Sequence, residues 1–450
     1  MKNKKLATME LNEAAIKRFS ASFAKNPGNR IALNAIAKTG LTDVTLNREV
    51  VTGTHNSFSH VLDEWKVTNQ KRSGRCWIFA GLNLLRVGMA KKMNLKQFEL
   101  SQNYSFFWDQ FERANYFLAN ILDTAKLPID DRVVAFLLER PIEDGGQWNM
   151  FVNVVNKYGL APKQAMPETE SSSGTMMMRS IVSYKLREGA LKLRTLVAKN
   201  ASEKSIESAR RSILDTVYRV LAIHLGEPPR TFDWQWTDKD KSFHRDGEIT
   251  PLEFKEKYVD LNLDDYVCLV NDTRKANPYG KTFTVDRLGN VIGGGIVRYL
   301  NMQIGQMKKI TAKIIEDGEP VWFGCDVGKM LDRKLGLWDS NLFEYDALYS
   351  TDFTLDKEQR LYYHATQMTH AMLFTGVDMV DGKPRRFRVE NSWGDENDQK
   401  GFYTMNSNWF DEYMFEIAAH KRYLTPKMIA ALDEKPIVLP PWDPMGALAR

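Results

Sequence analysis

Apolar residues recur with a helical period near the start of the chain. Between residues 11 and 25 they return every three or four positions, which predicts an amphipathic helix. Pro27 and Gly28 come directly after it and are expected to end it. From there to about Thr68 no period is visible, so we expect an irregular segment.

A second apolar stripe follows Cys76. Steps of four, three and four residues connect Ile78, Leu82, Leu85 and Met89, which predicts a buried helix that begins at or just before the cysteine. Residues 100–158 continue in a helical pattern, interrupted at 141–148 by two adjacent glycines. Segment 167–260 opens with a polar run that resembles a flexible linker and continues as charged amphipathic helices, so we expect a helical insertion.

The second half of the chain changes to short apolar runs that are typical of strands. These runs are residues 266–271, 320–327, 370–380, 385–394 and 401–405. Because helical patterns come first and strands last, the sequence predicts an α+β fold with segregated halves. The final residues contain four prolines between Glu434 and Pro444, and we expect an extended arm there rather than a core element.

Composition excludes several classes of protein. The chain has 450 residues, of which 43% are hydrophobic and 26% charged, so it can bury a large core and is not disordered. The net charge of +5 is too small to indicate a nucleic-acid partner. Only three cysteines occur, which fits a reducing compartment and no disulfide framework. No signal peptide or membrane-length apolar run is visible, so we expect a cytoplasmic protein without a membrane partner.

One cysteine stands in a chemically unusual place. Cys268 and Cys325 lie inside apolar runs and are expected to be structural, but Cys76 follows a Ser-Gly turn at a predicted helix start. The free amides and the dipole of a helix start favour a thiolate, which makes Cys76 a candidate nucleophile. Gln70, six residues upstream, carries an amide that can donate to the oxyanion of a tetrahedral intermediate.

Thiol chemistry also needs a base and a residue that orients the base. His370 opens an apolar strand-like run, which suits an imidazole held in a fixed direction. Asn391 stands at the end of the next run, where its amide can accept a hydrogen bond from that imidazole. On their residues alone, a capping or core role for His370 and a turn role for Asn391 stay open.

These residues carry a family resemblance. Gln70, Cys76, His370 and Asn391 follow one another in the order of the papain-like cysteine peptidases. More closely, nearly the whole chain resembles the group of aminopeptidase C and bleomycin hydrolase, through VTNQKRSGRCWIFAGLN, EDGGQWNMFVNVV, GEPPRTFDWQWTDKD, THAMLFTGV, VENSWG and PWDPMGALA. The resemblance implies a papain-like two-lobed fold, in which a helical lobe carries the nucleophile and an antiparallel, barrel-like β lobe carries the histidine and the asparagine.

The resemblance also implies a role for each residue of the site. The catalytic set is the nucleophile Cys76, the general base and acid His370, the orienting Asn391 and the oxyanion donor Gln70. Trp393 is expected to shield the histidine–asparagine bond from water. The residues expected to contact substrate are Gly145, Gly146, Trp393, Ala449 and Arg450, although the two glycines can equally serve the turn alone.

By the same resemblance the chain divides into five parts. They are an N-terminal helix and irregular segment (1–60), a helical catalytic lobe (61–166), a helical insertion for oligomerisation (167–260), a β-rich catalytic lobe (261–430) and a C-terminal arm (431–450). The insertion accounts for the 294 residues between Cys76 and His370, against about 130 to 150 in smaller papain-like enzymes. The group assembles into homohexamers with inward-facing sites.

The implied activity is that of a cysteine aminopeptidase of broad specificity, acting on peptides with a free N-terminus. In the group, the arm lies in the cleft and its terminal carboxylate pairs with the α-ammonium of the substrate. Arg450 extends beyond the end that is typical of the group. There are three alternatives: the cleft accommodates Arg450, the enzyme trims it, or the cleavage position is shifted by one residue.

Other functions stay open from the sequence. An arm that does not anchor substrate predicts an endopeptidase, and a cysteine–histidine pair also occurs in amidases, transglutaminase-like enzymes and glutamine amidotransferases. A basic channel for nucleic acid is a secondary possibility, with the candidate residues Lys2, Lys4, Lys5, Lys71, Arg72 and Arg75. There is no His-Glu-x-x-His motif, and GCDVGKM at 324–330 fails the P-loop pattern, so we expect no metal and no cofactor.

Overall fold

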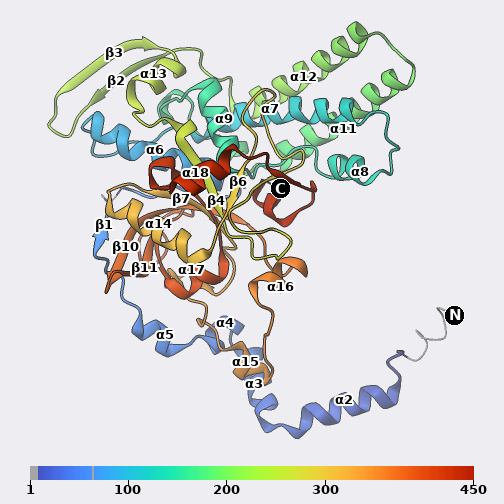
Figure 1. The fold of residues 1–450 in the computed structure, drawn as a ribbon, viewed down its shortest axis with the longest axis vertical. Helices are drawn as coiled ribbons and strands as arrows, with labels where there is room; N and C mark the ends of the chain where they lie inside the picture. The colour runs from blue at the N-terminus through green and yellow to red at the C-terminus, as the bar shows by residue number, and fades with distance from the viewer. Residues whose placement is uncertain (1–8, 63–64, 450) are drawn as a thin grey trace.

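The computed structural model describes residues 9–62 and 65–449 (Figure 1). Its N-terminal part is more helical than the pattern predicts, with α2 (Glu13–Lys25), α3 (Pro27–Lys38), α4 (Leu41–Thr45) and α5 (Arg48–Gly53). The predicted irregular segment is therefore wrong over residues 27–53. Pro27 begins a helix instead of only ending one, because proline is tolerated in the first helical turn and the Asn26 side chain accepts from Gly28 N–H as the N-cap.

The helices around the predicted nucleophile lie where the periodicity places them. They are α6 (Cys76–Lys92), α7 (Gln102–Asp123), α8 (Arg132–Glu139) and α9 (Trp148–Tyr158). Helix α6 is almost entirely buried, because it packs against α7 and α9 on one side and against strand β10 on the other. The apolar stripe that follows Cys76 thus marks a central helix of the fold.

The predicted insertion contains helices and a hairpin. Its elements are η1 (Lys163–Ala165), α10 (Glu170–Ser173), α11 (Met176–Ala198), α12 (Glu203–Leu225), β2 (Phe232–Thr237), β3 (Phe243–Ile249) and α13 (Pro251–Tyr258). The polar opening is ordered rather than linker-like, because a capping box between Thr169 and Ser172 starts α10. The β2–β3 hairpin, which the sequence pattern did not predict, projects beside α13 (Figure 1).

The second half of the chain forms one large sheet. Its strands are β4 (Tyr266–Val270), β5 (Thr282–Val285), β6 (Tyr299–Asn301), β7 (Val321–Cys325), β8 (Leu331–Asp332), β9 (Leu337–Trp338), β10 (His370–Val380), β11 (Lys383–Glu390), β12 (Phe402–Asn406), β13 (Met414–His420) and β14 (Ile437–Leu439). They follow the order β14-β5-β6-β4-β13-β7-β10-β11-β12-β9-β8, and β1 (His60–Val61) pairs with β10. Most pairs are antiparallel, and β4–β6, β5–β14 and β9–β12 are parallel.

Short helices cover and connect the strands. They are η2 (Leu263–Asp265), α14 (Ile304–Glu316), α15 (Tyr345–Tyr349), α16 (Lys357–Tyr362), α17 (Ser407–Tyr413), η3 (Lys421–Tyr423), α18 (Pro426–Asp433) and η4 (Pro444–Ala449). The predicted mixture of a helical first half and a strand-rich second half is confirmed. No helix in the described parts of the chain combines the length and the apolar character needed to cross a membrane.

The C-terminal segment is a packed element, and in this respect the predicted extended arm is wrong. Strand β14 joins the sheet beside β5, and residues 445–449 of η4 are buried. Figure 1 accordingly places the C-terminus in the middle of the molecule, between the helices and the sheet. The prolines do not keep this segment out of the core, because Pro444 occupies the first position of a short helix that needs no amide there.

Candidate active site

The thiol of Cys76 lies where the helical part meets the sheet. Helix α6 begins at this residue, as the pattern predicts, and its N-cap Arg75 makes no side-chain capping bond. The backbone N–H of Ala371, the second residue of β10, points at the Cys76 Sγ atom over 3.4 Å. Because His370 is the residue before Ala371, the fold brings the predicted nucleophile and the predicted base to the same point.

His370 and Asn391 are in direct contact. They stand at the start of β10 and just after the end of β11, two adjacent antiparallel strands, and 2.9 Å separate His370 Nε2 from Asn391 Oδ1. An amide oxygen only accepts, so Nε2 carries the hydrogen and Nδ1 is left to accept a proton. The centre of the Trp393 ring lies 4.9 Å from the centre of the imidazole. The Arg333 guanidinium lies 4.2 Å from the centre of the same Trp393 ring.

Gln70 is hydrogen-bonded to the residues that follow β11. Its backbone N–H donates to the Ser392 carbonyl over 2.8 Å, and the Ser392 hydroxyl donates to Gln70 Oε1 over 2.6 Å. The side-chain amide donates one hydrogen to the Ser73 carbonyl, which leaves its second hydrogen for another acceptor. Sequence reasoning missed Ser392, although its place directly after Asn391 was an available signal.

Burial opposes charge on the two central groups. It raises the pKa of the Cys76 thiol to about 12, and the negative charge of Asp144 acts in the same direction. Burial also lowers the pKa of His370 to about 4, against the opposing effect of its hydrogen bond with Asn391. Loss of solvation therefore opposes the preference for a thiolate that the helix start predicts. In both groups, burial favours the neutral form.

Asp144 organises the loop before the cysteine and was also missed from the sequence. Its carboxylate accepts from the backbone N–H of Gly74 over 2.7 Å and from the hydroxyl of Thr175, and Arg179 lies 3.1 Å away. Its backbone carbonyl accepts from the Trp77 indole over 2.8 Å. Asp144 thus connects the nucleophile loop with α11, which lies in the predicted insertion.

The two glycines after Asp144 are required by close packing. A Cβ atom on Gly145 would overlap the carbonyl oxygen of Leu448 in the C-terminal segment, and one on Gly146 would overlap the Trp77 ring. Arg113 of α7 holds the same loop by donating to the Gly145 carbonyl. The glycine pair therefore gives the C-terminal segment room beside the nucleophile loop.

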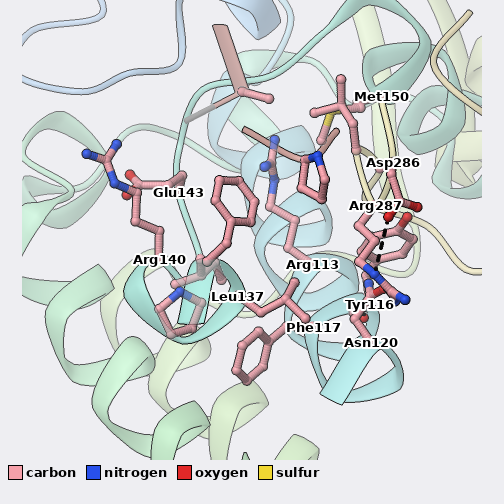
Figure 2. Close-up of a pocket in the computed structure, with 17 residues that line it drawn as sticks. Arg113, Tyr116, Phe117, Asn120, Leu137, Arg140, Glu143, Met150, Asp286 and Arg287 are labelled. Atoms are coloured by element: carbon pink, nitrogen blue, oxygen red, sulfur yellow. Dashed lines mark hydrogen bonds and ion pairs between the residues drawn. The ribbon is translucent and has the colours of Figure 1, made fainter. Parts of the chain in front are cut away.

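The end of the C-terminal segment borders a cavity. Of the predicted substrate contacts, Ala449 is buried, and Arg450 lies outside the described residues. A cavity of about 100 Å³ is lined by Ala449 and Pro441 on one side and by helix α7 on the other. Figure 2 shows Arg113 and Phe117 of α7 among the lining side chains.

One of the basic residues proposed for a nucleic-acid channel lies in the interior. Arg75 is fully buried and forms an ion pair of 2.6 Å with Glu168, so it cannot face a solvent channel and that assignment is wrong. Lys71 and Arg72 are exposed. Lys2, Lys4 and Lys5 lie outside the described residues.

Comparisons with known proteins agree with the resemblance. Residues 10–446 match the model of the Peptidase C1-like family. The chain is 43% identical to the bleomycin hydrolase of Mus musculus, and 40% identical to the aminopeptidase C of Lactobacillus delbrueckii subsp. lactis, over 98% of this chain and 99% of each relative. Among solved structures, PepW from Lactobacillus rhamnosis is 44% identical with a TM-score of 0.96, over 98% of this chain and 99% of that one.

Proposed function

The chain belongs to the Peptidase C1-like family, and from this membership we infer that it is a cysteine aminopeptidase that releases N-terminal residues from peptides. The observation that carries the inference is its similarity, over nearly its whole length, to proteins named aminopeptidase C and bleomycin hydrolase. The contacts of Cys76, His370 and Asn391 support it. In this reading the helices around α6 form one lobe, the sheet around β10 forms the other, and the reaction takes place between them.

Cys76 acts as the nucleophile in this mechanism. Its sulfur attacks the scissile carbonyl while the thiol proton passes to His370, whose Nδ1 is left to accept it. The backbone N–H of Cys76 and the free amide hydrogen of Gln70 stabilise the oxyanion. His370 then protonates the leaving amine as the C–N bond breaks, and later activates the water that hydrolyses the thioester. Asn391 keeps the imidazole oriented throughout.

The C-terminal arm restricts the cleft to free N-termini. The contact between Leu448 and Gly145 supports this, because it sets the arm against the glycine pair that resembles the one with which papain-like enzymes hold the substrate backbone. A peptide can then extend past the thiol in one direction only. Its α-ammonium ends at the tip of the arm, where the terminal carboxylate pairs with it.

Assembly into a homohexamer with inward-facing sites is part of the proposal. Exposed apolar side chains support it, on helix α2 (Ile16, Phe19 and Phe23) and on α11 and α12 (Met176, Met177, Ile181, Leu191 and Ile223). Surfaces of this kind mark contacts with other chains. A sedimentation experiment on the full chain tests this, and a monomer at micromolar concentration would contradict it. A cytoplasmic location is in keeping with three free cysteines.

The first experiment compares fluorogenic aminoacyl amides and N-acetylated peptides under reducing conditions, with the Cys76→Ala variant as control. We expect turnover of free-amine substrates only, and none by the variant. Equal cleavage of blocked peptides would keep Cys76 as the nucleophile but make the protein an endopeptidase. Activity that survives in Cys76→Ala would reject the thiol mechanism.

A further inference from the structure

A buried ion pair fastens the base of the C-terminal arm to the sheet. Arg274 donates to both oxygens of Asp443, from Nη1 over 2.9 Å and from Nη2 over 2.8 Å. The exposed fraction is 9% for Arg274 and 5% for Asp443. Two parallel hydrogen bonds between a guanidinium and a carboxylate fix direction as well as distance. Asp443 therefore has one defined position relative to the loop that follows β4.

Arg274 is held in place independently of the arm. Its Nε and Nη2 donate to the two oxygens of Asp272 over 2.9 and 2.7 Å. Asp272 in turn accepts from Asn277 over 2.6 Å, and its backbone amide and carbonyl both bond to the Asn301 side chain over 2.9 Å. These groups are buried, so the guanidinium is oriented by the end of the sheet.

The position of Asp443 determines where the arm's last helix begins. Asp443 Oδ1 accepts from the backbone N–H of Met445 over 2.9 Å, and η4 runs from there to Ala449. The Met445 carbonyl is fixed by the Tyr299 hydroxyl over 3.1 Å. With a rise of about 2 Å per residue, five residues of 3₁₀ helix carry the chain roughly 10 Å from Asp443 to Leu448. A shift at the base is thus transmitted to the contact with Gly145.

We propose that Arg274 and Asp443 form a latch that positions the arm and thereby determines the preference for free N-termini. This inference rests on the proposed function of the arm. The pair is a positioning device, because it touches the arm and the sheet but none of Cys76, His370 and Asn391. Weakening it should alter which peptides are accepted and leave the acyl-transfer chemistry intact.

The charges around the ion pair show which of its two residues should be substituted. Removing Arg274 would leave two carboxylates facing each other in a buried site, which threatens the fold. Removing the charge of Asp443 leaves Arg274 still paired with Asp272. Asp443→Asn keeps the volume and one acceptor, and Asp443→Ala removes both bonds. Glu434→Gln is the matched control, because Glu434 forms an exposed ion pair with Lys281 near the start of the arm, away from Arg274 and Asp443.

The experiment measures kcat/KM for a free-amine peptide and for its N-acetylated form. In Asp443→Asn we expect the ratio of the two values to fall at least about tenfold, with further loss in Asp443→Ala and no change in Glu434→Gln. The KM for the free-amine peptide should rise while kcat stays within about twofold. In a Cys76→Ala background, adding Asp443→Asn should accelerate hydrogen exchange over residues 445–449 and leave it unchanged elsewhere.

Three results would overturn the latch, and they are distinguishable. If Asp443→Asn keeps both the wild-type ratio and the wild-type exchange rates, the ion pair does not position the arm. If the wild-type enzyme already cleaves both peptides equally well, the proposed role of the arm fails, and the latch fails with it. General destabilisation would accelerate exchange along the whole chain, which also contradicts a local positioning role.

Discussion

Replacing Glu416 with glutamine should remove a large part of the pH dependence of the protein's stability. Glu416 lies on β13 with no exposed surface. Among the described residues, neither of its carboxyl oxygens has an ordinary hydrogen-bond partner, and the nearby Cys268 thiol donates over 3.3 Å to Asn149. Burial raises the pKa of Glu416 from 4.5 to about 8. The folded protein therefore holds a neutral carboxylic acid at neutral pH.

The sign and the size of the effect follow from this shift. Below pH 4.5 the carboxyl group of Glu416 is neutral in both the folded and the unfolded protein, so it does not lower the free energy of unfolding. Between pH 4.5 and 8 the unfolded chain loses the proton while the folded protein keeps it, so the free energy of unfolding falls as pH rises. A pKa raised from 4.5 to about 8 corresponds to about 5 kcal/mol of lost free energy of unfolding, at roughly 1.36 kcal/mol per pH unit. Above pH 8 the carboxyl group is ionised in both the folded and the unfolded protein, so the free energy of unfolding falls no further on its account.

The assay is urea unfolding of the wild type and Glu416→Gln from about pH 5 to about pH 9, at one protein concentration. We expect the variant to gain stability relative to the wild type by about 1.4 kcal/mol per pH unit between about pH 5 and 8, and no more above that. Glu256→Gln, at an exposed glutamate, is the control and should run parallel to the wild type. A difference between Glu416→Gln and wild type that is constant over the whole range would refute the reasoning, since it would mean that Glu416 does not stay neutral on folding.

Three further changes have expected outcomes. Gly145→Ala places a methyl group on the Leu448 carbonyl oxygen, so the arm must move, and cleavage of N-acetylated peptides should appear in the paired peptide assay while thermal stability changes little. Arg75→Ala leaves Glu168 without its buried partner and should cost about 3 to 5 kcal/mol in the free energy of unfolding, measured by urea titration; an unchanged midpoint would contradict it. Asn391→Ala frees the imidazole and should lower kcat by about 10² or more with KM nearly unchanged, and a normal kcat in steady-state assays would remove Asn391 from the mechanism.

Local patterns were sufficient to predict the elements that carry the site. The start of α6 at Cys76 followed from the spacing of the apolar residues, since a buried helix shows its face in the sequence. The strands that carry His370 and precede Asn391 followed from apolar runs of strand length. Family resemblance then supplied the order of the residues and with it their roles.

Such patterns do not predict contacts between residues that are far apart in the sequence. Asp144 meets Gly74 across 70 positions, and Arg274 meets Asp443 across 169. Nothing in either neighbourhood marks the partner, because a single aspartate in a polar loop is most often exposed to solvent. The same holds for the charge state of Cys76, since a helix start is visible in the sequence but the loss of solvation depends on what the whole fold places around the thiol.

In the proposed mechanism, chemistry and selectivity rest on different contacts, and this separation has a physical cause. The reacting groups are fixed where α6 meets β10, by contacts within the interior. The arm is held by the bond of Asp443 to Arg274, and near its end Leu448 lies against Gly145. Because only the tip approaches the reacting groups, movement of the arm changes the space available to the substrate before it changes the distances among those groups. An aminopeptidase built in this way should lose its preference for free N-termini more readily than it loses its ability to break a peptide bond.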